Sequence, residues 1–568
     1  MYARFKSRKT RLVIVITLVA GLSLGFVTWK DKEFDIVKNL EIFYSLFNEL
    51  DRFYVDETNP EKLVKSAIDG MLTSLDPYTT FIPEEDLEDF NFMTTGEYGG
   101  IGALIRKGGE YAMISEPYEN FPAQLAGLKA GDTILTIDGV STKGRNISEV
   151  SELLKGQPNT NLKVAVKRPG TNGILEKTIT RQKITIPNIP YYGIIENHIG
   201  YIRLSNFTKD AGKEGREAVL KLKQQGAQSI ILDLRGNPGG LLIESVNIAN
   251  LFLPKNQEVV STRGKVKQWD ITYKTTNEPV DTVIPLVVLV NRGSASASEI
   301  VAGAMQDLDR AVIIGQRTFG KGLVQTTRPV SYNSQLKVTT AKYYIPSGRC
   351  IQAVDYSHRN EDGSVGYVPD SLIREFKTRK GRKVYDGGGI SPDMTIDQGI
   401  PGNITLSLFS KNLIFDYATQ YAYQKPNVSG ISELKLSDRD YQDFLTFLKG
   451  KSYDYTTESD DQLEELIKTA KKEKYFAAAE SEFEALRKKI AHDKEKDLQT
   501  FSGEIRGILY EEIASRYFYQ KGRIIASLDE DPDLAKAVEV LRNPPAFASL
   551  LSNSKESEGK AGMRGAIY

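Results

Sequence analysis

The sequence predicts a multidomain protein with an α/β core, a compact β-rich module inserted ahead of it, and helical regions on either side. Three observations carry this prediction. Apolar strand runs alternate with helical patterns from Ile199 onward, short alternating segments separated by Gly and Pro occupy 99–180, and apolar residues recur at helical spacing outside these regions. At 568 residues the chain is long enough to bury at least two cores.

The N-terminus carries a basic flank followed by an apolar run from Leu12 to Trp29. A helix of about 18 residues rises about 27 Å, close to the roughly 30 Å hydrocarbon core, whereas the apolar part of a signal peptide spans about 7 to 15 residues. We expect residues 1–30 to form an inner-membrane anchor, with the remainder exported to the periplasm or outside the cell. The alternative is a cleaved signal peptide, because Ser23 and Gly25 offer a small-x-small site.

The regions before the core differ in their periodicity. Residues 31–92 are expected to form a small helical region, since Ile42, Leu46 and Leu50 follow helical spacing. Residues 93–180 contain alternating segments and turn signals, and therefore predict the β-rich module.

Residues 181–400 are expected to form the α/β core. The apolar runs 229–234 and 286–290 predict buried strands, each followed by a helical pattern. Residues 401–550 predict a helical domain that is dense in Glu and Lys, and 551–568 a flexible tail.

Composition excludes several classes of protein. Lysine plus arginine and aspartate plus glutamate both total 74, and no basic stripe stands out, so nucleic acid is not an expected partner. A single cysteine, Cys350, and three widely spaced histidines rule out a disulfide framework and the usual zinc sites. We therefore expect neither a metal nor a cofactor.

A serine-rich turn is the first segment that could carry chemistry. After the predicted strand ending at Val290, residues 291–300 read Asn-Arg-Gly-Ser-Ala-Ser-Ala-Ser-Glu-Ile, just before a helix begins. Such a turn can expose a serine hydroxyl at the positive end of a helix dipole. The alternative is an ordinary serine N-cap.

A glycine-flanked lysine is the second segment. Residues 315–322 resemble a phosphate loop, but Gly322 stands where Ser or Thr should bind magnesium, and an extended pattern follows instead of a helix. The glycines beside Lys321 would allow the backbone to bend and bring the amine into a pocket. The alternative is a solvated surface loop.

The third segment is a glycine-rich loop over 233–240, Asp-Leu-Arg-Gly-Asn-Pro-Gly-Gly, which joins a buried-looking strand to a helix. Its glycines can aim backbone N–H groups into one cavity. The alternative is a tight strand-to-helix turn.

In their order along the chain and in their residues, these three segments resemble motifs of the carboxyl-terminal processing peptidases, or tail-specific proteases. The resemblance extends over about residues 40–393. The resemblance implies a crotonase-like αβα sandwich and acyl-enzyme chemistry. It also implies Ser296 as the nucleophile, Lys321 as the base and Gln325 in support. The implied oxyanion-hole donors are Ala297 and either Gly239 or Gly240.

Two further blocks, 99–105 and 122–139, resemble a PDZ domain of the circularly permuted, protease-associated kind. Backbone N–H groups in a glycine-containing loop can hold a terminal carboxylate while the peptide pairs with a sheet edge. The candidates are Gly100, Ile101, Gly102 and Ala103. The alternative is that these glycines serve only a hairpin.

A lysine base imposes its own requirements. Lowering a lysine pKa from about 10.4 to near 7 disfavours the ammonium by roughly 4 to 5 kcal/mol, which desolvation can supply. We therefore predict that Lys321 is buried. Because four extended residues span about 13 Å, we also predict a bend at Gly320 or Gly322 that lets Gln325 orient the amine.

The sequence thus predicts a serine endopeptidase that acts on polypeptides with exposed C-termini. Three alternatives stay open: a PDZ scaffold that binds tails without cutting, a nucleotide-dependent enzyme, and an acyl-processing enzyme on a similar core. The C-terminal helices are candidates for oligomerisation or for recruiting an adaptor.

Overall fold

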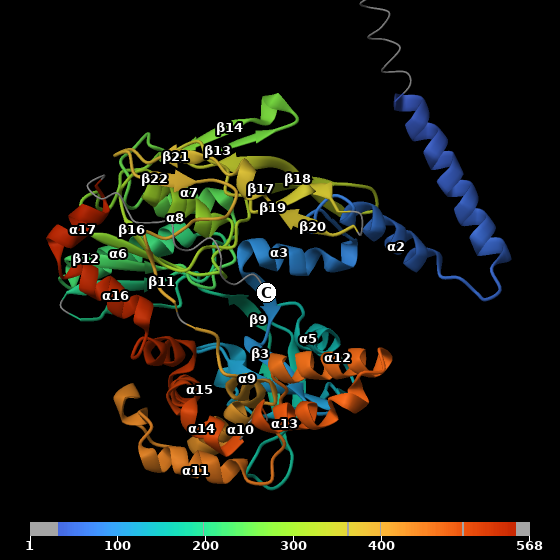
Figure 1. The fold of residues 1–568 in the computed structure, drawn as a ribbon, viewed down its shortest axis with the longest axis vertical. Helices are drawn as coiled ribbons and strands as arrows, with labels where there is room; N and C mark the ends of the chain where they lie inside the picture. Colours follow the sequence, from blue (N-terminus) through green and yellow to red (C-terminus); the bar gives the residue numbers. More distant parts are fainter. Residues whose placement is uncertain (1–31, 197, 361–362, 398, 491–493, 553–568) are drawn as a thin grey trace, which may run out of the picture. The chain divides into compact units, whose positions relative to one another are not determined.

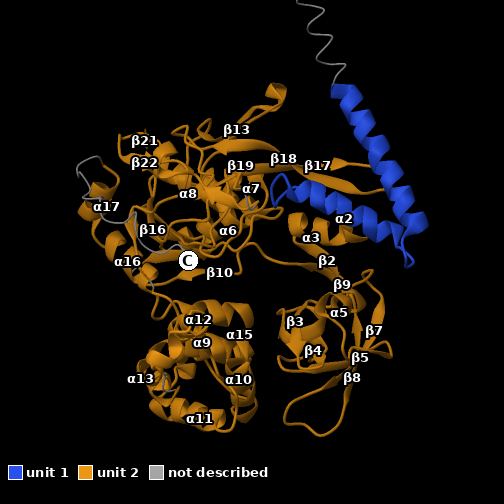
Figure 2. Ribbon diagram, turned by 45° about the vertical axis from the view of Figure 1, so that its right-hand side comes forward, with its two compact units in different colours: residues 1–81 blue, residues 82–568 orange. Residues whose placement is uncertain are grey.

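The computed structural model describes residues 32–196, 198–360, 363–397, 399–490 and 494–552. The chain divides into two compact units, Met1–Phe81 and Ile82–Tyr568, which Figure 2 colours separately. The expected anchor in residues 1–30 lies outside the described residues. Among the residues that are described, no helix combines the length and the apolar character needed to cross a membrane.

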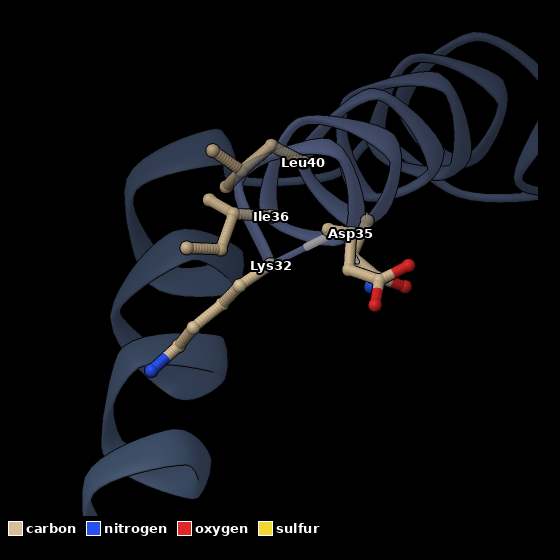
Figure 3. Close-up of a pocket in the computed structure, with 5 residues that line it drawn as sticks. Lys32, Asp35, Ile36 and Leu40 are labelled. Atoms are coloured by element: carbon tan, nitrogen blue, oxygen red, sulfur yellow. Dashed lines mark hydrogen bonds between the residues drawn. The ribbon is translucent and has the colours of Figure 1, made fainter. Parts of the chain in front are cut away.

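The first unit contains a helix over 32–53 and α2 (Pro60–Thr73). The helix over 32–53 exposes many of its large apolar side chains to solvent. At its start, a shallow hollow is lined by Lys32, Asp35, Ile36, Asn39 and Leu40. In Figure 3 the side chains of Lys32, Ile36 and Leu40 project from one side of the helix and Asp35 from the other. None of the expected catalytic residues lines this hollow.

The centre of the second unit is a sheet in the order β10-β11-β12-β15-β16-β23. β10 pairs antiparallel with β11, and the remaining pairs are parallel. Strands β12 and β15 are buried along their whole length, as expected for parallel strands covered on both faces. The strands are β10 (Tyr191–Ile194), β11 (Ile199–Arg203), β12 (Ser229–Asp233), β15 (Leu286–Val290), β16 (Val312–Gly315) and β23 (Met394–Thr395).

Helices cover both faces of this sheet. One face packs on residues of α6 (Ala211–Gln224), α7 (Leu242–Ala249) and α8 (Ala297–Asp307). The other packs on α16 (Pro532–Leu541) and on α17 (Pro544–Leu550), which lie beside β12 and β16 in Figure 1. Although they lie within the predicted C-terminal helical domain, 401–550, α16 and α17 therefore contribute to the core.

A second, antiparallel sheet is built from strands that come before and after α8 in the sequence. Strand β18 pairs with β13 and with β17, and β13 also pairs with β14. Two small hairpins follow before the chain returns to the central sheet at β23. The bounds are β13 (Glu258–Gly264), β14 (Ile271–Lys274), β17 (Leu323–Pro329), β18 (Gln335–Tyr344), β19 (Val354–Arg359), β20 (Val365–Tyr367), β21 (Glu375–Lys377) and β22 (Lys383–Tyr385).

The β-rich module has its own sheet and its own apolar core. Its strands run in the order β3-β4-β5-β7-β8, so β3 (Ala103–Gly108) lies at an edge. The other elements are β4 (Tyr111–Pro117), α4 (Pro122–Leu125), β5 (Thr133–Ile137), β6 (Val140–Ser141), α5 (Ile147–Leu154), β7 (Asn161–Lys167) and β8 (Leu175–Thr180). Strands β2 (Glu97–Gly100) and β9 (Gln182–Thr185) pair where the chain enters and leaves the module, and α3 (Leu87–Thr95) precedes β2.

A separate apolar cluster is buried by α9 (Asn403–Ser410), α10 (Leu413–Gln424), α11 (Asp438–Leu448), α14 (Lys494–Thr500) and α15 (Ser502–Ser527). Between α11 and α14 the chain forms α12 (Glu458–Lys472) and α13 (Glu480–Ile490). Helix α15 is kinked, because Phe518 and Tyr519 have non-helical backbone angles. Beyond the kink, Arg523 pairs with Glu116 of the β-rich module at 2.7 Å.

Candidate active site

Ser296 lies on the turn between β15 and α8, where it is the N-cap of the helix. Its φ of 55° and ψ of −112° fall in a region that residues with a side chain rarely adopt. Every residue of α8 is buried, whereas Ser296 is half-buried. The turn therefore presents a partly accessible serine at the positive end of a buried helix.

Asn237 fixes the glycine-rich loop against this turn. Its carbonyl oxygen accepts the N–H of Ala295 at 3.0 Å and the hydroxyl of Ser298 at 2.9 Å. The Asn237 side chain donates to Leu204 O at 2.8 Å and accepts the N–H of Gly239 at 2.9 Å. The residues on both sides of Ser296 are thus bound to one atom of the neighbouring loop.

Gly239 makes the closest approach of this loop to Ser296. Its φ is +100°, and a Cβ at this position would lie 2.8 Å from Ser296 Cβ and 2.9 Å from Ala297 N. No residue with a side chain fits there without displacing the turn. Within the described part of the chain, the N–H groups of Gly240 and Ala297 have no hydrogen-bond acceptor, whereas that of Gly239 is bound to Asn237.

Lys321 lies between two glycines just ahead of β17 and is half-buried. The bend expected here occurs at Gly320, whose φ is +87°. Both glycines pack tightly, because a Cβ on Gly320 would meet Ala353 Cβ at 2.4 Å and one on Gly322 would meet Gln352 N at 2.8 Å. The strand that follows contrasts with the helix of a phosphate loop.

Glu299 joins the serine turn to the lysine loop. Its Oε2 accepts the N–H of Ser296 at 2.8 Å and the N–H of Lys321 at 2.9 Å. Its Oε1 accepts the hydroxyl of Thr318 at 2.6 Å and the N–H of Gly320 at 2.7 Å. Burial raises the pKa of Glu299 to about 7, although these four donors act in the opposite direction.

Tyr343 of β18 joins the same two segments through their carbonyl groups. Its hydroxyl is within hydrogen-bond distance of Ser296 O at 3.2 Å and also contacts Lys321 O. The residue is only 1% exposed. Glu299 and Tyr343 thus hold the backbones of Ser296 and Lys321 together from two sides. Neither was among the residues predicted from the sequence.

Gln325 lies on β17, next to an irregularity in the pairing with β18 between Val324 and Gln325. It is half-buried, and its side-chain Nε2 donates to Thr339 Oγ1 at 3.1 Å. The amide of Gln325 is therefore held across the β17–β18 pair.

A buried charge cluster fixes the start of the glycine-rich loop. Asp233 accepts hydrogen bonds from Tyr201 at 2.6 Å, Arg203 at 2.8 Å and Arg235 at 2.7 Å. Burial alone would raise the pKa of Asp233, but Arg235 and Arg203 outweigh it and lower the pKa to about 2. No group of three His, Cys, Asp or Glu residues suited to a metal ion occurs among the described residues.

The expected carboxylate-binding residues lie between β2 and β3. Gly100 ends β2, Ile101 is buried in the core of the module, Gly102 has a φ of +71°, and Ala103 begins the edge strand β3. Burial raises the pKa of Tyr98 to about 12, opposed by hydrogen bonds from the backbone of Gly102 and Ala103. The Tyr98 hydroxyl therefore lies near the backbone of Gly102 and Ala103, where a carboxylate is expected to bind.

Three parts of the chain match known protein families. Residues 198–358 match peptidase family S41, 113–168 match the PDZ domain, and 404–541 match the C-terminal helical domain of probable PDZ-proteases.

The chain is 37% identical over 372 residues to a carboxy-terminal-processing protease of Bartonella bacilliformis, covering 64% of this chain and 82% of the relative. It is 37% identical over 319 residues to a probable CtpA-like serine protease of Staphylococcus aureus, covering 55% of this chain and 62% of the relative.

Two solved structures are also similar. A photosystem II D1 C-terminal processing protease shares 30% identity, covering 62% of this chain and 92% of its own, with a TM-score of 0.34. A PDZ domain of a carboxy-terminal protease from Vibrio cholerae in complex with peptide shares 29% identity, covering 16% and 99% respectively, with a TM-score of 0.15.

Proposed function

The chain belongs to the carboxy-terminal-processing proteases of peptidase family S41 and is a serine peptidase, and we propose on this basis that Ser296 and Lys321 form its catalytic dyad. One observation carries the proposal: Glu299 binds the N–H groups of both residues, and Tyr343 contacts both carbonyl groups. Two loops distant in sequence are thereby fixed next to each other.

In the proposed reaction the neutral amine of Lys321 removes the proton from Ser296 Oγ, which attacks the carbonyl carbon of the scissile peptide. The ammonium then gives its proton to the leaving amine, and an acyl-enzyme remains on Ser296. Water, deprotonated by the same amine, hydrolyses the ester. The half-buried position of Lys321 and its glycine neighbours support this role, since partial desolvation favours the neutral amine.

For the oxyanion hole we assign the N–H groups of Ala297 and Gly240. Both lack an acceptor within the described residues, while the N–H of Gly239 is bound to Asn237. Gly239 instead has a steric role, because it lets the loop approach Ser296. Gln325 is assigned to orienting Lys321, supported by its position on the strand that directly follows the lysine loop.

The PDZ domain implies that the substrates are polypeptides. We propose that their C-terminal carboxylate binds the segment formed by Gly100, Ile101, Gly102 and Ala103, and that the peptide extends along β3. The edge position of β3 supports this arrangement, because an edge strand can accept an additional strand.

We propose the division into domains expected from the sequence, with a PDZ domain over 93–180 and a protease core over 181–400. The layering of helices on both faces of the central sheet supports an αβα sandwich of the crotonase-like kind, completed by α16 and α17. The basic flank and the apolar residues 12–29 support export of the catalytic part.

The test is hydrolysis of an unstructured polypeptide by the wild type, Ser296→Ala and Lys321→Ala, with Glu539→Gln on the surface of α16 as the control. We expect both dyad variants to lose hydrolysis while circular dichroism and PDZ peptide binding are retained. Ser296→Ala should also trap substrates, whose C-termini mass spectrometry can identify. Turnover by Ser296→Ala would contradict the dyad, and a wild type that binds tails without cutting would favour the scaffold.

A further inference from the structure

Arg235 of the glycine-rich loop is bound by two carboxylates from the other end of the chain. Its NH1 donates to Asp531 at 2.9 Å and to Asp533 at 3.0 Å, and its NH2 lies 2.6 Å from Asp531 Oδ2. The side chains of Arg235, Asp531 and Asp533 are 11%, 8% and 0% exposed. These contacts are therefore shielded from solvent and from salt.

Asp531 and Asp533 occupy fixed positions because they begin α16. Asp531 is the N-cap of the helix, and its Oδ1 accepts the N–H of Asp533 at 3.0 Å and the N–H of Leu534 at 3.1 Å. The apolar face of α16, including Leu534, Ala537 and Val538, packs on the central sheet. The position of Arg235 is thus fixed by contacts with α16, and this helix cannot move without exposing one apolar face of the central sheet to solvent.

Further hydrogen bonds connect Arg235 to the turn that carries Ser296. The Arg235 N–H and Nε both donate to Asp233 Oδ1, at 2.9 and 3.0 Å, so the backbone and side chain of Arg235 are held together. Asn237, two residues further, binds Ala295 and Ser298 on either side of Ser296. A change at Arg235 is therefore transmitted to the loop that carries Gly240.

We propose that Asp531 and Asp533 are positioning residues for peptide hydrolysis, holding the oxyanion loop 236–240 in place through Arg235. This proposal rests on the dyad and the oxyanion hole proposed above. Neither carboxylate reaches the reacting atoms, so both act through Arg235 and Asn237. Helix α16 is accordingly part of the structure that positions the oxyanion loop.

The charges of this cluster explain why carboxylates other than Asp233 surround Arg235. Asp233 faces two guanidinium groups, Arg203 and Arg235, so by itself it leaves one positive charge unbalanced. Asp531 and Asp533 together more than balance this charge, and they saturate the outer edge of the Arg235 guanidinium. Without them, the guanidinium would turn toward solvent and take the loop with it.

The experiment compares the full-length wild type with Asp531→Asn, Asp533→Asn and Glu539→Gln. Asparagine preserves the N-cap at position 531, so Asp531→Asn tests the charge in a folded protein even where Asp533→Asn is unstable. Glu539 also lies on α16 but pairs with Lys536 on the surface, which makes it a matched control.

We expect kcat to fall about 10- to 100-fold in both Asp variants with KM within about twofold, because the loss concerns the transition state. A peptide boronate, whose tetrahedral adduct places an oxygen in the oxyanion hole, should bind more weakly by a similar factor. PDZ peptide affinity should stay unchanged, and Asp533→Glu should recover part of kcat. Glu539→Gln should match the wild type in every measurement.

Two outcomes would overturn the inference. One is a kcat within twofold of wild type in folded Asp531→Asn. The other is a fall in kcat that active-site titration fully explains by a smaller fraction of folded enzyme. Ser296→Ala is measured in parallel: if it remains active, the proposed dyad fails, whereas an inactive Ser296→Ala beside fully active Asp variants refutes only the positioning role.

Discussion

Ser296 and Lys321 share a single hydrogen-bond acceptor, since the backbone N–H of each donates to Glu299 Oε2, at 2.8 and 2.9 Å. The shared oxygen sets the distance between the two loops without touching either reacting side chain. The geometry of the proposed dyad therefore depends on the buried carboxylate of Glu299, at the start of α8, which is not one of the two proposed reacting groups.

Replacing Glu299 with glutamine should lower kcat/KM by about 10- to 100-fold, or about 1.4 to 2.7 kcal/mol in transition-state stabilisation. In glutamine, an NH2 group replaces one of the two carboxylate oxygens of Glu299. This group cannot accept the two hydrogen bonds that the replaced oxygen accepts, so two of the four hydrogen bonds are lost. Steady-state hydrolysis of a peptide measures the effect. Glu244→Gln is the control, because Glu244 also accepts a backbone N–H, from Gly212, but outside the site.

The same carboxyl should make stability depend on pH. Burial raises the pKa of Glu299 from its ordinary 4.5 to about 7, so the folded protein binds this proton more tightly than the unfolded chain. The resulting stabilisation is present below pH 4.5 and is lost as pH rises through 7, by about 3 kcal/mol in total. Thermal unfolding of wild type and Glu299→Gln between pH 5 and 8 should show a shrinking difference in Tm; a constant difference would contradict the shift.

Adding one methyl group at Gly239 should abolish activity, with a loss of at least about 100-fold. An alanine Cβ would press on Ser296 Cβ and on the Ala297 N–H, both within 2.9 Å. Gly236→Ala is the matched control, since Gly236 also has a positive φ of 67° but its nearest neighbour would be 3.8 Å away. Equal losses in the two variants would attribute the effect to backbone strain instead of contact with the nucleophile.

Removing the hydroxyl of Tyr98 should tighten binding of peptides with a free C-terminus by about 3- to 10-fold, the net effect of one or two neutral hydrogen bonds. In the wild type that hydroxyl lies close to the backbone of Gly102 and Ala103 and would compete with the carboxylate for their N–H groups. Calorimetry with free and amidated peptides measures the difference, and Tyr111→Phe on β4 is the control. Weaker binding by Tyr98→Phe would show that the hydroxyl contacts the ligand instead of competing with it.

Local patterns predicted the segments of the candidate site because its candidate residues lie in short, contiguous motifs. The predicted strand 229–234 corresponds to β12 and 286–290 to β15, and the helical pattern expected after the first run corresponds to α7, which begins at Leu242. Glu299 could also have been recognised, since a glutamate three residues after a serine N-cap is the pattern of a capping box.

Tyr343 and Asp533 could not have been found in this way. Tyr343 reaches Ser296 only because β18 pairs with β17, and that pairing depends on a register set by tertiary packing. The apolar stripe of α16 predicts that one face is buried, but the pattern does not specify which surface covers it. The role of such a residue depends on a partner that is distant in the sequence, so no local pattern of residues can predict it.

The covering of the central sheet by α16 and α17 affects when this enzyme can first become active. The ribosome completes β11, β12 and β15 long before it reaches residues 532–551, so during synthesis one apolar face of the sheet has no cover. We expect the nascent protease to remain latent until its last helices have docked. Such a delay would spare the emerging chain from premature cleavage.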